Sequence, residues 1–328
     1  MSFVSKKSTI RVVGANPNGG GVLTFVKNLA SDRLKMEIYG YREYLRFISN
    51  IQKGDTIFFN VIKPSIPFLF IVTLIGRTQF HLVYCGHGLN YKNNNGARRI
   101  IVRFFEKWLS KRMNKVIVIN GKDLSEFRKW NENSFVLPTY LKPKNRPQKS
   151  STNVSSDSVS WVAVGKVEGR KDPNNFIEIA RTILEEYPND RFTWIGEGPL
   201  LPEMKYKSAN IAGCNFIGGI ENDHVREHLF ETNIFLCTST FEVLPMSILE
   251  AVEAGCILVV RNYYYSSDVG DRFKSSFIYR SVDEIMNLRQ DSGVLKRLKS
   301  YAIEHQAVLE EEYNEYINNI ASILCLGK

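Results

Sequence analysis

The chain has 328 residues and a hydrophobic fraction of 44%, a length that fits two globular domains better than one. Its five cysteines are scattered and odd in number, which favours buried thiols in a reducing compartment over a disulfide framework. We find neither a signal-peptide core before the first strand nor an apolar run of about 20 residues, so we expect a cytoplasmic protein. The net charge of +9 favours an anionic partner: nucleotide phosphates, a lipid phosphate, an anionic membrane or nucleic acid.

Glycines separate the first two predicted elements. A strand at residues 9–13 runs into a loop that contains Gly19, Gly20 and Gly21, and a helix follows at residues 22–29. Such a loop lets backbone N–H groups approach a bound anion, although its spacing is not that of a dinucleotide fingerprint. The alternative is an ordinary flexible loop.

A single histidine stands between two glycines after a later strand. Strands are predicted at residues 55–61 and 81–85, with an apolar helix at residues 66–75 between them. His87 follows the second strand, and its glycine neighbours leave room for it to face a cleft at the strand end. The alternative is that His87 simply caps or packs there.

Residues 98–112 predict a helix with two different stripes. The aromatic stripe has helical spacing and comprises Ile101, Phe104, Phe105 and Trp108. The basic stripe repeats every four residues and comprises Arg99, Arg103, Lys107 and Lys111. The simpler interpretation is that the aromatic stripe packs the helix against the protein while the basic stripe is solvated. The alternative is that this helix meets anionic lipid headgroups at the inner face of a membrane.

A strand at residues 115–119 and a helix through Trp130 end the first half, and prolines, basic residues and serines then mark a linker. Strands and helices alternate again in the second half. The predicted strands are at residues 160–164, 191–195, 215–217, 234–237 and 256–260. The predicted helices are at residues 173–187, 222–230, 245–254 and 309–324.

Two consecutive βα halves predict an α/β protein with two Rossmann-like doubly wound domains that face each other across a cleft. The first domain comprises residues 1–145, the linker residues 146–158 and the second domain residues 159–308. A terminal helix at residues 309–328 is predicted to pack back toward the first domain.

Two carboxylates, Glu242 and Glu250, bracket a loop and the first turns of the helix that follows it. Ligands of parallel sheets bind beside the carboxyl ends of strands, where helix N-termini point at them. We therefore expect Glu242 at the mouth of a ligand site and Glu250 in the helix that rises from it.

Several motifs of the second half resemble the nucleotide-sugar-binding domain of the family 4 GT-B glycosyltransferases, the retaining glycosyl transferases group 1. These motifs are Gly165-Lys166 with Lys171, Gly196-Glu197-Gly198-Pro199, Phe216-Ile217-Gly218, and Glu242 with Glu250 leading to Gly255. The resemblance is strong over residues 160–260 and weaker in the first half, where the glycine loop and Gly-His-Gly correspond. Lys166 stands where the family has arginine, which keeps the charge but loses bidentate geometry.

The resemblance implies transfer of a sugar from a nucleotide-diphosphate sugar to a saccharide or lipid-linked saccharide, in lipopolysaccharide, O-antigen, capsule or exopolysaccharide biosynthesis. The catalytic residues it implies are Glu242, Lys171, Lys166 and His87. The donor-binding residues it implies are Gly19, Gly20, Gly21, Gly165, Glu197, Ile217, Gly218, Leu244, Pro245, Met246, Ser247 and Glu250.

Each implied residue has a role in that chemistry. Lys166 and Lys171 neutralise the charge that builds on the leaving diphosphate, assisted by the helix N-terminus near Met246. The resemblance implies that Glu250 binds the ribose hydroxyls and that Glu242 contacts the sugar. It also implies that backbone near Ile217 holds the base, that the glycine loop approaches the diphosphate, and that His87 contacts the donor sugar or the acceptor.

We expect no cofactor and no metal, because the resemblance implies metal-independent enzymes and the chain lacks an Asp-x-Asp pair. His224 and His228 stand four apart, but no third ligand with suitable spacing accompanies them. The alternative functions are a sugar-nucleotide epimerase or hydrolase of the same fold, and a non-catalytic binder of a nucleotide sugar. Binding to nucleic acid is not expected, because no nucleic-acid motif accompanies the basic charge.

Overall fold

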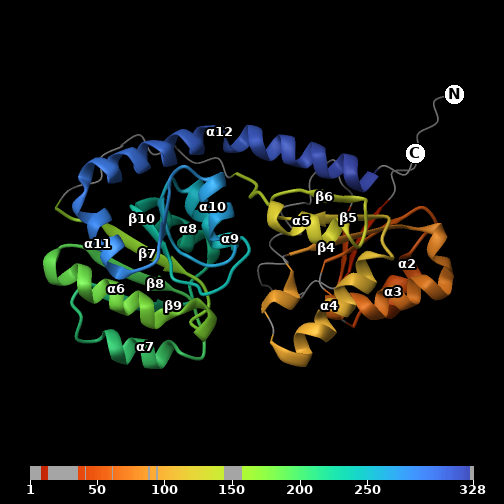
Figure 1. The fold of residues 1–328 in the computed structure, drawn as a ribbon, viewed down its shortest axis with the longest axis horizontal. Coiled ribbons are helices and arrows are strands. Elements are labelled where there is room, and N and C mark those ends of the chain that lie inside the picture. Colours follow the sequence, from red (N-terminus) through yellow and green to blue (C-terminus); the bar gives the residue numbers. More distant parts are fainter. Residues whose placement is uncertain are drawn as a thin grey trace. The chain divides into compact units, whose positions relative to one another are not determined.

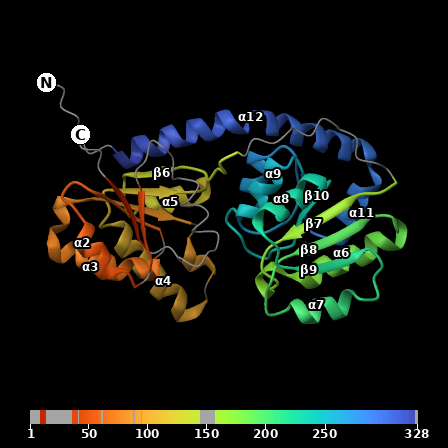
Figure 2. The same cartoon turned by 180° about the vertical axis from the view of Figure 1, so that it is seen from behind.

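The computed structural model describes residues 9–13, 36–40, 42–60, 62–87, 89–93, 95–143 and 157–325. The chain divides into two compact units, which are drawn in Figures 1 and 2. Unit 1 comprises residues 1–142 and 312–328, and unit 2 comprises residues 143–311. Most of the predicted linker, residues 146–156, lies outside the described residues, as do Gly19, Gly20, Gly21 and the predicted helix at residues 22–29.

Unit 1 contains a parallel sheet of six described strands in the order β2-β1-β3-β4-β5-β6. The strands are β1 Ile10–Val13, β2 Met36–Tyr39, β3 Thr56–Phe59, β4 His81–Gly86, β5 Lys115–Val118 and β6 Ser134–Val136. The described helices are α2 Tyr44–Asn50, α3 Ile62–Gly76, α4 Gly96–Ser110 and α5 Gly121–Arg128, with short 3-10 turns at Arg77–Gln79 and Asn90–Asn93. The strand order reverses between β1 and β3, which makes their carboxyl ends a topological switch point.

Unit 2 contains a second parallel sheet, in the order β12-β11-β10-β7-β8-β9. The strands are β7 Ser160–Val164, β8 Arg191–Ile195, β9 Cys214–Gly218, β10 Ile234–Cys237, β11 Ile257–Arg261 and β12 Ser276–Tyr279. The helices are α6 Pro173–Glu186, α7 Leu201–Ser208, α8 Asn222–Glu231, α9 Met246–Glu253, α10 Ser266–Arg272 and α11 Val282–Gln290, with a 3-10 turn at Gly169–Lys171. Here the switch point lies between β7 and β10. Figures 1 and 2 show α6 and α11 on one face of this sheet and α8 and α9 on the other.

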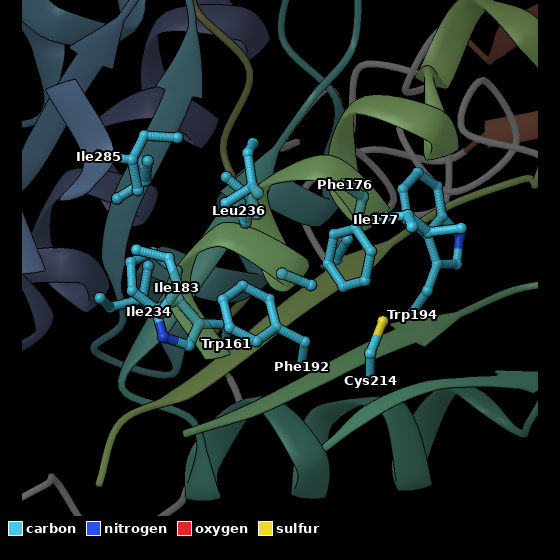
Figure 3. Packing of buried hydrophobic residues seen from close by; sticks show 14 of the residues in the cluster. Trp161, Phe176, Ile177, Ile183, Phe192, Trp194, Cys214, Ile234, Leu236 and Ile285 are labelled. Carbon is cyan, nitrogen blue, oxygen red and sulfur yellow. The ribbon is translucent and has the colours of Figure 1, made fainter. Parts of the chain in front are cut away.

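Helix α6 shows how local sequence signals build unit 2. Pro173 opens the helix, and the Oδ1 atom of Asp172 accepts a hydrogen bond from the N–H of Asn175 at 3.2 Å. Its buried face packs on aromatic side chains of the sheet. Trp161 stacks on Phe192 with ring centroids 5.1 Å apart, and the ring of Phe176 lies edge-on between the strands' aromatics (Figure 3).

Some elements differ from the predicted ones. Strands β2, β6 and β12 were not predicted, because each is only three or four residues long and has exposed or half-buried positions. The last helix, α12 Ser292–Cys325, begins at Ser292 rather than at residue 309. Its first turns are apolar only at well-spaced positions such as Leu295 and Leu298, and Lys299 lies buried among them with its Nζ donating to the Gly255 carbonyl at 2.6 Å.

The end of α12 packs within unit 1. Lys115 Nζ donates a hydrogen bond to the Ile323 carbonyl at 3.0 Å, and the rings of Tyr140 and Tyr316 lie 5.2 Å apart. Among the described residues, no helix combines the length and the hydropathy that a membrane span requires.

Candidate active site

The loops that follow β7 and β10 lie side by side at the switch point of unit 2. Strand β7 pairs with β10 in parallel, so the two loops leave the sheet at the same edge. Two hydrogen bonds join the loops: Thr238 Oγ1 donates to the Lys171 carbonyl at 2.7 Å, and the N–H of Thr240 donates to the Arg170 carbonyl at 2.9 Å. This edge is where parallel α/β sheets bind their ligands.

Glu242 stands between two cations at this edge. Its Oε1 atom lies 2.7 Å from Lys171 Nζ and 2.7 Å from a terminal nitrogen of Arg170. Glu242 is only 8% exposed, so a buried carboxylate is neutralised by charges that sit on the neighbouring loop. The structure therefore brings together the predicted residues Glu242 and Lys171, which lie far apart in the sequence.

Arg170 was not predicted as part of the site. The same guanidinium also donates to the Phe241 carbonyl at 3.2 Å, so it contacts both the side chain and the backbone of the β10 loop. The only signal in the sequence was its position beside Lys171, which does not tell to which side an arginine turns.

Lys166 takes a different place from Lys171. Its side chain is 63% exposed and its Nζ lies 3.5 Å from Glu168 Oε2. The ammonium is therefore held at the open side of the β7 loop, and no ion pair joins it to Glu242 among the described residues. Gly165, which precedes it, has a φ of 151°, and the Lys171 side chain passes directly beside it.

The loops after β8 and β9 complete this edge. Glu197 Oε1 accepts a hydrogen bond from the N–H of Gly219 at 2.8 Å, which ties the two loops together. Gly218 adopts a φ of 83°, a left-handed conformation that favours glycine, and Ile217 beside it is partly exposed. Backbone groups of residues 217–219 are thus presented at the rim near Glu197.

Helix α9 starts directly after the β10 loop. Pro245 is its N-cap residue, Leu244 precedes it, and Met246 and Ser247 form the first turn, all partly buried. Glu250 lies one turn further along the helix and is also partly buried. The first turn points its unpaired N–H groups toward the loop that carries Glu242.

His87 lies in unit 1, at the carboxyl end of β4. Its Nε2 atom is 2.5 Å from Oδ1 of Asn60, which follows the neighbouring strand β3. Burial lowers the pKa of His87 to about 4. The imidazole is therefore neutral at neutral pH, and it contacts a second polar residue that was not predicted.

The lowered pKa predicts how stability depends on pH. The unfolded chain takes up a proton at His87 near pH 6.5 but the folded chain only near pH 4, so the unfolded state binds more protons between these values. The contribution of His87 to the free energy of unfolding is thus complete above pH 6.5 and is lost as the pH falls toward 4. We expect His87→Gln to lose about 1–2 kcal/mol less than the wild type between pH 7 and pH 4.5 in urea unfolding. Identical pH dependence in both proteins would contradict this.

Helix α4 shows the opposite orientation to the simpler interpretation of its sequence. Its buried residues are Glu106, Leu109 and Ser110, whereas Ile101, Phe104 and Phe105 are exposed. The aromatic stripe therefore does not pack the helix against the protein. Arg99 and Arg103 lie over the ring of Tyr91, at 5.7 and 5.4 Å from its centroid.

An open pocket lies beside this helix. Its lining consists of Tyr91, Arg99, Ile100, Arg103, Phe104, Lys107 and Glu126. Arg103 also forms an ion pair with Glu126 at 2.7 Å. The pocket thus combines basic side chains with exposed apolar ones.

Metal-binding groups do not gather in the described part of the chain. There, no three His, Cys, Asp or Glu side chains lie close enough to hold one ion. His224 and His228 are both exposed on α8.

The paired loops of unit 2, with glycines, lysines and carboxylates at a Rossmann-like switch point, match a known family. Residues 145–302 match the profile described as Glycosyl transferases group 1. This part of the chain belongs to that family. The resemblance stated from the motifs is thereby confirmed.

Curated glycosyltransferase relatives share limited parts of their length with this chain. The phosphatidylinositol N-acetylglucosaminyltransferase of Arabidopsis thaliana has one component that is 30% identical over 113 residues, which are 34% of this chain and 25% of the relative. The alpha-monoglucosyldiacylglycerol synthase of Acholeplasma laidlawii is 25% identical over 179 residues, 51% of this chain and 44% of the relative. The matched segments thus span less than half of either relative.

The fold as a whole is that of GT-B glycosyltransferase structures. WaaG, a glycosyltransferase involved in lipopolysaccharide biosynthesis, is similar with a TM-score of 0.69 and 14% identity, covering 97% of this chain and 100% of WaaG. The predicted fold class, with two Rossmann-like parallel sheets, is confirmed.

Proposed function

We propose that the protein is a retaining glycosyltransferase that moves a sugar from a nucleotide-diphosphate sugar to a saccharide or lipid-linked saccharide. The observation that carries the proposal is the group of Lys171, Arg170 and Glu242 at the switch point of a domain that belongs to the group 1 family. Cations at this position suit a leaving diphosphate, because negative charge accumulates there as the glycosidic bond breaks.

The cations differ in how freely they can move. Lys171 is only 12% exposed and is oriented by Glu242, so its ammonium is pre-positioned before a ligand arrives. Lys166 is exposed and paired only loosely with Glu168, so it can reach toward a phosphate without breaking a short ion pair. We infer that Lys171 meets the diphosphate at a fixed place and that Lys166 closes on it from the open side.

Carboxylates then bind the neutral parts of the donor. Glu250 would accept hydrogen bonds from the ribose hydroxyls, and Glu242 would contact the sugar near the bond that breaks. The backbone near Ile217 and Gly218 would hold the base, since the exposed rim there carries backbone groups. Both lysines carry the phosphate charge in this arrangement, so we propose that transfer requires no metal.

The acceptor class is inferred from the relatives and from the surface of unit 1. Both reported relatives are named for transfer of a sugar to a lipid-bearing acceptor. A saccharide or lipid-linked acceptor in surface polysaccharide synthesis is consistent with these names, with His87 in contact with the donor sugar or the acceptor.

A product analysis tests this function. The protein is incubated with UDP, GDP, ADP and CMP sugars, each with and without glycolipid and oligosaccharide acceptors, and products are examined by proton NMR. Transfer with the donor's anomeric configuration retained, unaffected by a chelator, is the expected result. A product formed from the donor alone would favour an epimerase or hydrolase instead, and binding without any product would favour a non-catalytic binder.

We further propose that unit 1 docks on an anionic membrane surface through α3 and α4. Neighbouring helices α3 and α4 expose seven large apolar side chains by between 37% and 72%. These are Phe70, Leu74, Ile75, Ile100, Ile101, Phe104 and Phe105. The basic stripe of Arg99, Arg103, Lys107 and Lys111 runs along α4 and its C-cap, and apolar side chains beside cations are what an anionic bilayer surface binds.

Vesicle co-sedimentation measures this docking. We expect Lys107→Glu/Lys111→Glu to weaken binding to anionic vesicles about tenfold or more, because each basic residue near such a surface contributes about 1 kcal/mol. These two lysines are chosen because Arg103 already pairs with Glu126. Ile100→Ser/Phe104→Ser should also weaken binding, whereas Tyr206→Ser, at an equally exposed ring on α7, should not. Unchanged binding in both α4 variants would exclude this helix from the membrane contact.

A further inference from the structure

Asn60 occupies the switch point of the unit 1 sheet. It directly follows β3, whose Phe59 pairs with Val13 of β1 on one side and with Tyr84 of β4 on the other. The carboxyl ends of β1 and β3, where the strand order reverses, are where an open α/β sheet binds its ligand. Asn60 therefore lies next to His87 at the ligand-binding edge of its own unit.

The hydrogen bond between these two residues defines the state of the imidazole. Asn60 Oδ1 lies 2.5 Å from His87 Nε2, and an amide oxygen can only accept. Nε2 must therefore carry the proton, and the lone pair of a neutral ring then lies on Nδ1. Because burial keeps the pKa of His87 low, this neutral tautomer persists across the physiological range.

The other end of the Asn60 amide is unsatisfied. Asn60 is 1% exposed, and its Nδ2 atom is buried without a hydrogen-bond partner in the described residues. Buried amide donors are nearly always paired in folded proteins, because an unpaired one forfeits its hydration. An N–H group left in this condition at a ligand-binding edge is suited to an oxygen that the ligand supplies.

We propose that Asn60 is a positioning residue that fixes the tautomer of His87 and donates its amide N–H to a hydroxyl oxygen of a bound sugar. The contact with His87 Nε2 holds the amide oxygen in place, and the Nδ2 donor at the other end of the same planar group is thereby aimed at the ligand. The second part of this proposal rests on the proposed glycosyltransferase function, whereas the first part concerns the ligand-free protein alone.

Nitrogen-15 NMR of the imidazole rings tests the first part without any substrate. The chain has five histidines, so the His87 resonances can be assigned by His87→Gln. In the wild type we expect a neutral ring protonated at Nε2 down to about pH 5. Asn60→Asp should raise the titration midpoint of His87 by at least one pH unit, since a carboxylate beside the ring favours its charged form. Asn60→Leu should abolish the tautomer preference.

Other residues serve as controls. His81 lies at the opposite end of the same strand β4, and its resonances should be the same in all three proteins. A wild-type ring protonated at Nδ1, or a midpoint of His87 that is unchanged in Asn60→Asp, would overturn the tautomer assignment. Should Asn60→Asp fail to fold, the tautomer of His87 in Asn60→Leu decides the same question.

Kinetics with the donor identified by product analysis test the second part. Asn60→Leu is expected to raise KM for the sugar substrate at least tenfold, because a buried donor and the ring orientation are both lost. In Asn60→Asp the acidic limb of the rate profile should move to higher pH by the shift that NMR measures. An unchanged KM and an unchanged pH profile would reduce Asn60 to a structural residue. If no donor is turned over, the proposed function fails while the NMR result still stands.

Discussion

Lys171→Ala is expected to lower the rate of sugar transfer by about 10²–10³-fold, the usual effect of removing one pre-positioned charge from a transition state. Lys171 is held at this edge by Glu242, whose carboxylate lies 2.7 Å from its ammonium, and its side chain is far less exposed than that of Lys166. Glu242 keeps its contact with Arg170 in the variant, so the carboxylate is not left unpaired. We therefore expect the melting temperature to fall by only a few degrees.

Steady-state kinetics and thermal unfolding of the same preparations measure both effects. Lys205→Ala serves as the matched control, since Lys205 is an exposed lysine on α7 of the same unit. It should retain wild-type rate and stability. Wild-type activity in Lys171→Ala would show that the diphosphate charge is carried elsewhere, and a large loss of stability would show that Lys171 has a structural role instead.

Gly196→Ala is expected to destabilise unit 2 by about 3 kcal/mol, the combined effect of forced overpacking and an unfavourable backbone conformation. A Cβ atom at this position would lie 2.0 Å from the Gly165 carbonyl oxygen, and Gly196 has a φ of 150°. Backbone cannot move aside as a flexible side chain can. The loops after β7 and β8 should separate, and donor binding should weaken with them.

Gly169→Ala is the matched control for this substitution. Gly169 lies in the same β7 loop, but a Cβ there would have open space within 4 Å. Urea unfolding should give a free energy of unfolding for Gly169→Ala close to that of the wild type. Equal stability of Gly196→Ala and Gly169→Ala would mean that the close backbone approach at Gly196 is relieved at little cost.

Local patterns were sufficient to predict much of the fold. Apolar runs separated by helical periods predicted most strands of both sheets, and Pro173 marked the start of α6. Strands such as β12 were missed because a short run at a sheet edge has only partial burial and so a weak pattern.

The orientation of α4 could not be predicted, for a physical reason. Helical spacing separates the faces of a helix, but it does not say which face meets the protein. Here the buried face carries the charged Glu106, and the exposed one carries Phe104. Hydrophobicity alone would assign these two residues the other way around.

The site was predicted in part. The distance in sequence between Lys171 and Glu242 hides a direct contact that only the parallel pairing of β7 with β10 creates. Arg170 and Asn60 were missed because their roles depend on which partner each side chain reaches, and no local pattern reveals this. Gly19, Gly20 and Gly21 lie outside the described residues, so their place at the diphosphate stays a prediction.

Titration calorimetry with UDP, GDP, ADP and CDP, on the wild type and on Lys171→Ala, tests the claim that unit 2 binds the diphosphate of a sugar nucleotide. We predict that at least one of these nucleotides binds the wild type and binds Lys171→Ala at least tenfold more weakly, while Lys205→Ala matches the wild type. Failure of all four to bind the wild type, or equal affinity for Lys171→Ala, would contradict the account.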